Sequence, residues 1–558
     1  MSAPTRYSLL PTSARDEPYR DDVYPPPRSP SQLSPFSPRR YRFSRACGGI
    51  LVGVLCLLVV SGVYFSNSSP AAQSDDSTDT PIPPPSPPFD PPPPPPPPPP
   101  PDDHKPPPAI TPEAIAQKHI DDLYASQSQT LTQATARYTL KNGRPPPRNF
   151  DKWFDFAQEK GCLIDDYDQI TRDFVPFYRL AEAHPTWLQT MIELGRELML
   201  RDPRGMATIK IRDGAVHMPD YTGSAFDGEW KDTISRFSHV LPDMEVLMNG
   251  RDEPRVVYNS RDPAMLQNAI NRTDTEPFWH RPIPTSEFFK DKSGCVTFDA
   301  GNGYILNALE DVAFIRSSSS SDFTTDLWPI LSMTKISPCF SDILFPGQYY
   351  YYSSGWSGKF SHPNDIPWSE KKPQLYWRGT SNGGHIYGQN YRKFSRFRLI
   401  KIAQNHTDIM DAKMNAFWEW HCTDDCERDP IIKEYGIGGE GRPREDVYGY
   451  KYALDVDGNT FSGRYLGLMR SGSLVFKATA FEEYFSTWLL PYHHYIPVKI
   501  DMSDLVEKVK WAIANDAEAR QIQENGRQFA ERVLTDVQND CYFARVLLEW
   551  GRVQGGGK

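Results

Sequence analysis

Strand-like and helix-like segments alternate along the C-terminal part of this 558-residue chain, and this alternation limits the possible fold most strongly. The predicted strands are residues 374–379, 450–458, 473–478 and 494–500, and the predicted helices are residues 391–406, 463–472, 482–490 and 502–516. Such alternation indicates a parallel sheet with crossover helices, a doubly wound α/β lobe. Sheets of this kind bind ligands beyond the C-terminal ends of their strands.

The part of the chain before this lobe mixes helices with short strands. Residues 206–216 and 244–252 read as strands that run into loops. The roughly 410 residues from 145 onward exceed one ordinary core, so two lobes are expected. We place these lobes at residues 145–365 and 366–555, within an α/β fold class.

A membrane anchor is predicted near the N-terminus. Residues 46–65 contain no charged side chain and span roughly 30 Å as a helix, enough to cross a bilayer. Four arginines directly before this run predict a cytosolic tail at residues 1–45 and a lumenal C-terminal part. A cleaved signal peptide is the alternative, but the 45 residues ahead of the run are too many for one.

A proline-rich stalk and a helical stem are expected next. Residues 66–110 include a long proline tract, which forms a stiff polyproline II rod. Residues 109–141 read as one helix with Thr111 as its N-cap, inside a stem at residues 111–144. Asn67, Asn271 and Asn405 begin N-glycosylation sequons, as a lumenal domain permits.

Six cysteines follow the anchor, an even number that allows three disulfides in fifteen different pairings. Cys422 and Cys426 are close enough to suggest zinc. Because no second Cys or His pair stands at a suitable spacing, we expect disulfide partners instead. The net charge of −10 argues against general nucleic-acid binding.

Two loops of the second lobe are candidate anion sites. Residues 378–384 (RGTSNGG) place small donor-rich residues after a strand, and residues 459–464 (NTFSGR) do the same before a helix. Backbone N–H groups, hydroxyls and arginines in such loops can grip a diphosphate without a metal ion. The alternative is an ordinary turn followed by a solvated basic helix. In the anion-site interpretation, Arg392 is the phosphate partner, and Lys393, Arg396 and Arg398 form a solvated helix face.

Four acidic residues raise two separate questions. Asp252 and Glu253 emerge at the end of a predicted strand, where a carboxylate suits a general base, although Arg251 or Arg255 could hold it in a structural ion pair. Asp455 and Asp457 read as strand-end carboxylates that cap turns. A metal pair or a hydrolytic pair of acids remains the alternative for those two residues.

Several ungapped blocks in the right order complete the pattern. Residues 241–254, DILFP, YWRGTSNGG, residues 451–477 and HYIPVKIDMSDL together resemble the capsule-associated, lipopolysaccharide-modifying-type glycosyltransferases of family ninety. That family includes fungal capsule β-1,2-xylosyltransferases and animal protein O-glucosyltransferases. The resemblance spans residues 145–552 and implies a GT-B architecture, with two Rossmann-like lobes, an acceptor-side lobe and a nucleotide-sugar lobe, around a cleft.

The resemblance also implies roles for particular residues. The catalytic aspartate of the family falls on Asp252, a nucleotide-sugar contact on Thr380 and, less closely in spacing, a diphosphate-binding arginine on Arg392. Arg378 is added on its chemistry alone. The donor-binding segment before the next helix falls on Asn459, Thr460, Phe461, Ser462, Gly463 and Arg464.

An inverting transfer from a UDP-sugar to a glycan, glycolipid or glycoprotein hydroxyl follows from the resemblance, with no metal or cofactor required. UDP-xylose and UDP-glucose are the expected donors. Because NTFSG departs from the alanine-rich run of the animal O-glucosyltransferases, the choice of sugar is not copied from those enzymes. The anchor and the C-terminal VQGGGK favour the Golgi membrane over the endoplasmic reticulum. A non-catalytic lumenal carbohydrate-binding protein is the alternative reading.

Overall fold

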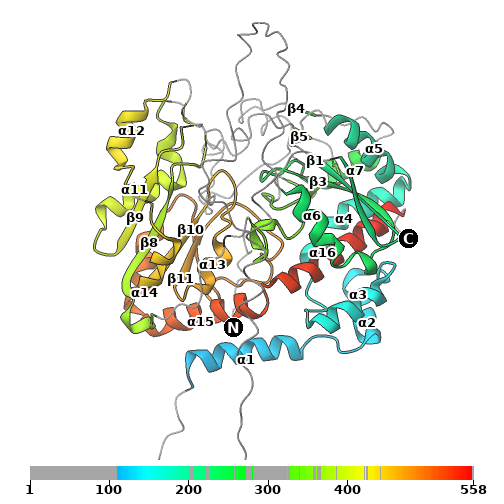
Figure 1. The fold of residues 1–558 in the computed structure, drawn as a ribbon, viewed down its shortest axis with the longest axis horizontal. Helices are drawn as coiled ribbons and strands as arrows, with labels where there is room; N and C mark the ends of the chain where they lie inside the picture. Colours follow the sequence, from blue (N-terminus) through cyan, green and yellow to red (C-terminus); the bar gives the residue numbers. More distant parts are fainter. Residues whose placement is uncertain are drawn as a thin grey trace, which may run out of the picture. The chain divides into compact units, whose positions relative to one another are not determined.

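Two five-stranded sheets form the centre of the part of the protein that the structure describes (Figure 1). The computed structural model describes residues 110–555 apart from residues 200–205, 221–225, 257, 260–261, 272–278, 281–322, 325–326, 338–339, 356–357, 359, 361–365, 385, 387, 420–421, 423–424 and 440. The predicted α/β fold class is confirmed in this part. A separate antiparallel pair joins β4 (Trp279–His280) to β5 (Phe323–Thr324).

The first sheet is mixed, with strand order β2-β1-β3-β6-β7. Its strands are β1 (Met206–Arg212), β2 (Ala215–Asp220), β3 (Met244–Asn249), β6 (Leu331–Ser332) and β7 (Ile343–Leu344). Strands β2, β1 and β3 pair antiparallel, whereas β3, β6 and β7 pair parallel. Because β3 is buried along its whole length, the residues after it emerge at the edge of a buried sheet.

The second sheet is parallel throughout, with strand order β12-β11-β10-β8-β9. Its strands are β8 (Lys372–Thr380), β9 (Met410–Ala416), β10 (Tyr450–Val456), β11 (Leu474–Ala478) and β12 (Ile496–Val498). The helices α11 (Ser395–Asn405), α12 (Arg428–Tyr435) and α13 (Tyr465–Arg470) make the crossovers, and α14 (Leu505–Ala514) follows β12. Since β8 and β10 are parallel neighbours, the loops after them lie at the same edge.

In the second lobe, one predicted helix is wrong and one strand of the sheet was not predicted. Residues 482–490 form turns, because the backbone of Glu482 exchanges hydrogen bonds with Lys335 (N···O 2.7 and 3.0 Å) and is held extended. Strand β9 was not predicted, because it carries the polar residues Asp411, Lys413 and Asn415. An edge strand tolerates such residues.

The second sheet lies between two apolar cores. Tyr452, Leu454 and Val456 belong to one core on one face of β10. Ala453, on the other face, belongs to a core that also contains Val246 of the first sheet. This second core is therefore continuous between the two sheets.

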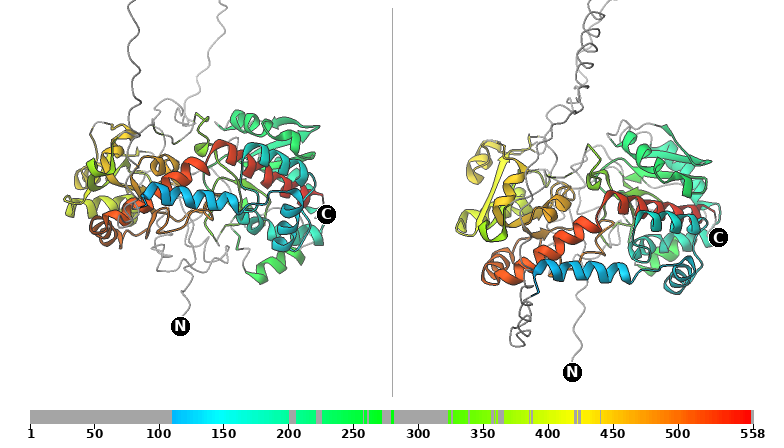
Figure 2. Two further views of the ribbon diagram at one scale, coloured as in Figure 1. Left: turned by 90° about the horizontal axis from the view of Figure 1, so that it is seen from below. Right: turned by 60° about the horizontal axis from the view of Figure 1, so that its bottom comes forward.

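Helices cover the sheets and connect distant parts of the chain. These helices are α1 (Pro112–Ala125), α2 (Leu131–Asn142), α3 (Phe150–Lys160), α4 (Asp168–Ala183), α5 (Trp187–Met199), α6 (Asp227–Ser235), α7 (Pro263–Asn271), α15 (Asp516–Arg532) and α16 (Asp536–Gln554). α16 packs against α3, α4, α6 and β3, while α1 lies along α15 (Figure 2). The predicted single helix at residues 109–141 is instead two helices, because Thr130 caps α2 through its side-chain oxygen.

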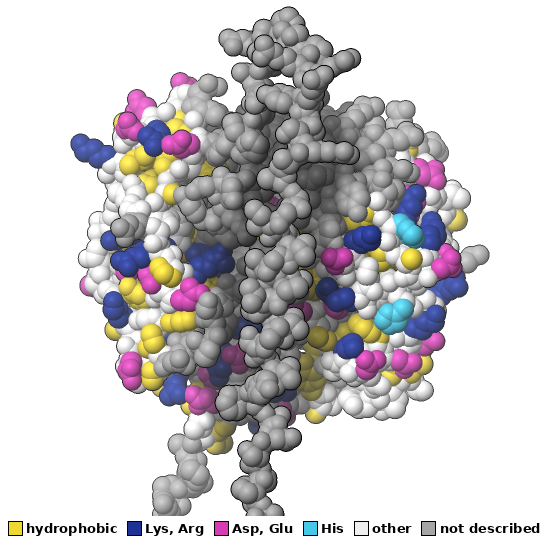
Figure 3. All heavy atoms as spheres, in the orientation of Figure 1, with side chains coloured by type: hydrophobic (Ala, Val, Ile, Leu, Met, Phe, Trp, Pro, Cys, Tyr) yellow, Lys and Arg dark blue, Asp and Glu magenta, His cyan; other side chains and the backbone are white. Residues whose placement is uncertain are grey.

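Two disulfides lie in the described part. Cys162, before α4, bonds to Cys541 of α16, and Cys422 bonds to Cys426. The expectation that Cys422 and Cys426 are disulfide partners is therefore confirmed. On the face shown in Figure 3, Lys and Arg side chains are interspersed with Asp and Glu over the described residues.

The predicted tail, anchor and stalk at residues 1–45, 46–65 and 66–110 lie outside the described residues, except for Ile110. Of the helices that are described, none is both long and apolar enough to cross a membrane. Asn67 also lies outside them. Asn271 and Asn405 are exposed at the ends of α7 and α11, and their glycosylation stays a prediction.

Candidate active site

The loop after β3 is fixed by the side chain of Asn249, which is fully buried. Its amide nitrogen donates to the carbonyl of Glu253 (2.7 Å) and to Ser332 Oγ (3.1 Å). Its amide oxygen accepts from the backbone N–H of Arg251 (2.9 Å) and from Arg255 Nε (3.1 Å). One side chain thus ties both ends of the loop that carries Asp252.

Asp342 holds the far end of the same loop. Its carboxylate accepts from the backbone N–H groups of Arg255 (2.8 Å) and Val256 (2.9 Å) and from Ser332 Oγ (2.5 Å). Burial raises the pKa of Asp342, while these hydrogen bonds act in the opposite direction. Asp342 is therefore a structural carboxylate that shapes the loop.

Asp252 lies at the tip of this loop and is half-buried. Burial raises the pKa of Asp252 well above its usual range, the charge of Glu253 raises it further, and Arg255 opposes both. Tyr349 Oη donates to Asp252 Oδ1 over 3.4 Å. A carboxylate with a raised pKa at a strand end has the proton affinity that a general base needs.

Tyr349 and Tyr350, from the 3₁₀ turn Gln348–Tyr350, connect Asp252 to the second sheet. The ring of Tyr349 lies 5.5 Å from that of Phe461, centroid to centroid, and a Cβ placed on Gly463 would lie 3.0 Å from Tyr349 Cδ1. Tyr350 lies 5.8 Å from the Phe461 ring, and its hydroxyl donates to the carbonyl of Ser462 (3.5 Å). The predicted base and the predicted donor segment are thus brought together.

Gly358 packs directly on the donor segment. A Cβ at Gly358 would lie 1.5 Å from the carbonyl oxygen of Gly463, so no side chain fits there. The Gly358 N–H also donates to the carbonyl of Tyr349 (3.1 Å). The backbone of Gly358 therefore packs directly against the backbone of Gly463 in the segment at 459–464.

The two predicted anion loops are tied to each other. The N–H of Gly383, in the loop after β8, donates to Asn459 Oδ1 (3.1 Å), in the loop after β10. Arg396 of α11 donates to Asn382 Oδ1 (2.6 Å) and to the carbonyl of Asp457 (2.9 Å). The interpretation of Arg396 as part of a solvated face is wrong, because only 1% of this residue is exposed.

Thr380 belongs to the same junction. Its carbonyl accepts from Arg396 Nη1 (3.1 Å), and its hydroxyl donates to Asn382 Oδ1. Lys393 is exposed and Arg398 half-buried, so the solvated-face interpretation holds better for these two residues. Arg464, at the start of α13, donates through Nη1 to the carbonyl of Arg378 (2.8 Å), which brings a second guanidinium to the junction.

Two predicted phosphate-binding arginines are held in ion pairs. Arg378 Nη2 lies 2.7 Å from Asp411 Oδ1, and its Nη1 donates to the carbonyl of the same residue (2.7 Å). Arg392, 45% exposed at its side chain, grips both oxygens of Glu434 (2.5 and 2.7 Å). The phosphate-binding roles of these two arginines stay predictions. Each role requires that the arginine break its ion pair with a carboxylate before it binds a phosphate.

The hydroxyls of the donor segment are buried. Thr460, Phe461 and Ser462 have no exposed surface, and within the described residues Thr460 Oγ1 and Ser462 Oγ make no hydrogen bond. Buried hydroxyls without partners are uncommon. They are available as donors to a ligand at this junction.

The aspartates of β10 have structural surroundings. Asp455 Oδ2 pairs with Lys477 Nζ at 2.7 Å, and both side chains are buried. Asp457 Oδ2 accepts from the backbone N–H of Ala480 (2.8 Å), and burial raises its pKa well above the usual range. These contacts match the predicted turn-capping role and count against a paired hydrolytic or metal-binding role.

Sequence reasoning missed Tyr349, Arg396 and Asn249. Asn249 stands two residues before Arg251 of the recognised Arg-Asp motif, so its position was a usable signal. Tyr349 stands in a run of four tyrosines, none of which the pattern distinguishes. Arg396 sits among three other basic residues, and only its burial sets it apart.

Comparisons with known proteins find one matching family and several relatives. Residues 305–555 match the sequence profile of Glycosyl transferase family 90. The chain is 33% identical over 180 residues to Protein O-glucosyltransferase 2 of Danio rerio, covering 32% of this chain and 34% of that protein. It is 29% identical over 188 residues to Protein O-glucosyltransferase 3 of Homo sapiens, covering 34% and 33%. Each match thus spans about a third of the relative's length.

Proposed function

We propose that this chain, whose residues 305–555 match Glycosyl transferase family 90, transfers xylose or glucose from a UDP-sugar to an acceptor hydroxyl. Glycans and glycoproteins are the proposed acceptors, since the relatives are named protein O-glucosyltransferases. Asp252 is the proposed general base. The segment Asn459–Arg464 and the loop around Thr380 are the proposed donor site.

The contacts of one tyrosine are the main support for this proposal. Tyr349 reaches from Asp252 Oδ1 (3.4 Å) to the ring of Phe461 (5.5 Å), so a base and an anion-binding segment meet across one aromatic side chain. A transferase that joins an acceptor to a nucleotide sugar needs this juxtaposition. The two sheets on either side support a GT-B arrangement of two Rossmann-like lobes.

The proposed reaction is a single displacement. Asp252 removes the proton of the acceptor hydroxyl while that oxygen bonds to the anomeric carbon, and the bond from this carbon to the diphosphate oxygen breaks. UDP departs with the electron pair, and an α-linked donor gives a β-linked product. A positioned base contributes about 10²–10⁴-fold to such a rate.

The departing diphosphate gains negative charge, which donors fixed at the junction would stabilise. Arg464 and Arg396 supply guanidinium groups, and Thr460 and Ser462 supply buried hydroxyls. Each prearranged donor of this kind contributes roughly 10²–10³-fold in comparable sites. We propose that these groups, without a metal ion or other cofactor, offset the charge of the leaving group.

The proposed location is the Golgi membrane. Residues 46–65 would anchor the chain with its N-terminus in the cytosol, and residues 66–110 would hold the catalytic part away from the bilayer. The sequons at Asn271 and Asn405, both exposed, support a lumenal catalytic part.

The full-length protein tests this function with a panel of UDP-sugars. Release of UDP is measured with and without acceptor glycans, and with and without EDTA. We expect release from UDP-xylose or UDP-glucose that depends on the acceptor and persists in EDTA. Saturable glycan binding with no UDP release from any donor would contradict transfer and favour a non-catalytic carbohydrate-binding protein.

A further inference from the structure

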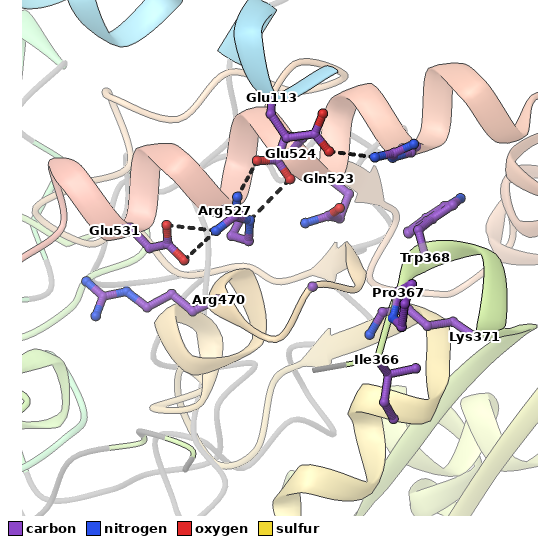
Figure 4. Close-up of a pocket in the computed structure, with 12 residues that line it drawn as sticks. Glu113, Ile366, Pro367, Trp368, Lys371, Arg470, Gln523, Glu524, Arg527 and Glu531 are labelled. Carbon is purple, nitrogen blue, oxygen red and sulfur yellow. Dashed lines mark hydrogen bonds and ion pairs between the residues drawn. The ribbon is translucent and has the colours of Figure 1, made fainter. Parts of the chain in front are cut away.

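A cavity of about 600 Å³ opens at the opposite edge of the second sheet from the candidate active site (Figure 4). Ile366, Pro367, Trp368 and Lys371, just before β8, line one side, and α15 lines another with Gln523. The active-site loop begins after Thr380, at the other end of β8. The nine residues of this strand span about 30 Å, so the two sites are separate.

Lys371 is the buried cation of this cavity, with 4% of the residue exposed. Its ammonium group donates to the carbonyls of Tyr448 (2.6 Å) and Ser471 (3.5 Å). An ammonium group carries three protons, so one remains for a ligand. Burial lowers the pKa of Lys371 to about 8.

Gln523 adds a second unused donor. It is 6% exposed, it lines the cavity, and its Nε2 makes no hydrogen bond within the described residues. A buried amide N–H₂ without an acceptor is costly, and a ligand oxygen would satisfy it. Lys371 and Gln523 come from different parts of the chain, and the fold brings their unused protons to one cavity.

The charges around the cavity select a monoanion. Its walls carry four cationic side chains and three carboxylates, which leaves one positive charge. The ion pairs are Arg520 with Glu113 and Arg527 with Glu524 and Glu531, and Arg470 donates to the carbonyls of Ala530 and Leu534. Lys371 and Arg470 are the lining cations outside these ion pairs, and a net charge of one positive unit matches a carboxylate better than a doubly charged phosphate.

The remaining wall is apolar. Ile366, Pro367 and Trp368 line it, and the indole Nε1 of Trp368 donates to Asp516 Oδ2 (3.1 Å), which fixes the ring. The C–H face of a pyranose packs well on a fixed aromatic ring, and its hydroxyls are acceptors for Gln523. A volume of about 600 Å³ accommodates one or two such rings.

We propose that this cavity binds a sugar residue that carries a carboxylate, with the carboxylate on Lys371 and the ring between Trp368 and Gln523. Such a site holds an acidic glycan away from the site of transfer. This role goes beyond the proposed transferase activity and does not depend on Asp252.

Binding of D-glucuronate to the full-length protein tests the proposal directly. Isothermal titration calorimetry without UDP-sugar compares D-glucuronate, D-glucose and inorganic phosphate. We expect saturable glucuronate binding, with glucose and phosphate each weaker by about tenfold or more, as the loss of one charge-assisted hydrogen bond predicts. No glucuronate binding, or phosphate binding as tight as glucuronate, would overturn the proposal.

Variants locate the ligand in this cavity. Lys371→Met is expected to weaken glucuronate binding at least about tenfold, and Gln523→Leu several-fold. The matched control is Lys372→Met, because Lys372 is the next residue but is exposed and outside the cavity lining. Wild-type affinity in both Lys371→Met and Gln523→Leu refutes the site. If Lys371→Met does not fold, Gln523→Leu decides alone, and UDP release measured in parallel keeps this test separate from that of transfer.

Discussion

Two strands of this protein lead into aspartates at their C-terminal ends, with different results. Asp455 of β10 is buried against Lys477 at 2.7 Å, and Asp457 after it accepts a backbone hydrogen bond. Asp252 after β3 is half-buried and faces the hydroxyl of Tyr349. Position at a strand end is therefore common to the structural carboxylates and to the proposed catalytic one. Solvent exposure of the side chain and the groups that it contacts distinguish the two kinds of carboxylate.

The largest expected effect on stability is that of Asp455→Asn. This substitution leaves Lys477 as a buried charge without its partner, which costs about 3–5 kcal/mol in the free energy of unfolding. Thermal unfolding followed by circular dichroism measures the loss. Asp252→Asn serves as the contrast and should unfold at or above the wild-type temperature, because burial already disfavours its charged form.

A double variant refines this contrast. Asp455→Leu with Lys477→Met removes both charges, so it should recover much of the stability that Asp455→Asn loses. An unchanged unfolding temperature in Asp455→Asn would show that the β10 pair is not structural, and the distinction between the two aspartates would fail.

Arginines of the second lobe extend the comparison to UDP binding. Arg396→Gln removes a buried guanidinium that joins the two anion loops, so UDP affinity should fall by roughly tenfold or more. Arg392→Gln, which removes the exposed partner of Glu434, should leave UDP affinity unchanged. Fluorescence titration with UDP measures both. The opposite ranking would restore Arg392 as the diphosphate ligand.

The pH dependence of transfer probes the raised pKa of Asp252. A base acts in its ionised form, so kcat/KM is full above the pKa of Asp252 and falls as the pH drops through it. Because burial raises that pKa, the acidic limb should lie well above the ordinary aspartate value of about 3.9. A profile that stays flat down to about pH 4 would contradict a buried base.

The smallest expected effect is that of Tyr349→Phe. The ring that packs on Phe461 stays, and only the hydroxyl that donates to Asp252 is lost. We expect kcat/KM to fall roughly two- to tenfold, with the acidic limb moved to higher pH and UDP affinity unchanged. A fall in UDP affinity without any shift of that limb would mean that Tyr349 serves the donor segment alone.

Local patterns in the sequence predicted much of the second lobe. The buried apolar runs of β8, β10 and β11 and the loops after them are visible in short windows of sequence. The placement of Asp252 after β3 follows from the same reasoning, because one strand and one turn suffice to present it.

Long-range contacts account for what the sequence did not predict. Residues 482–490 have a helical pattern, yet the backbone pairing of Glu482 with Lys335 prevents the helix. In the sequence, Arg396 cannot be distinguished from its basic neighbours. Its burial arises because α11 packs against two loops that are distant in sequence. Tyr349 gains its position only when residues from both sheets surround it, and no local window contains that information.

The most direct test of the proposed site is Asp252→Asn in the full-length protein, with UDP affinity and sugar transfer measured on the same sample. Asparagine keeps the shape of the loop but cannot accept the acceptor's proton. The proposal predicts wild-type UDP affinity together with a loss of transfer of about 10²–10⁴-fold. Full transfer by this variant would contradict the assignment of Asp252 as the base.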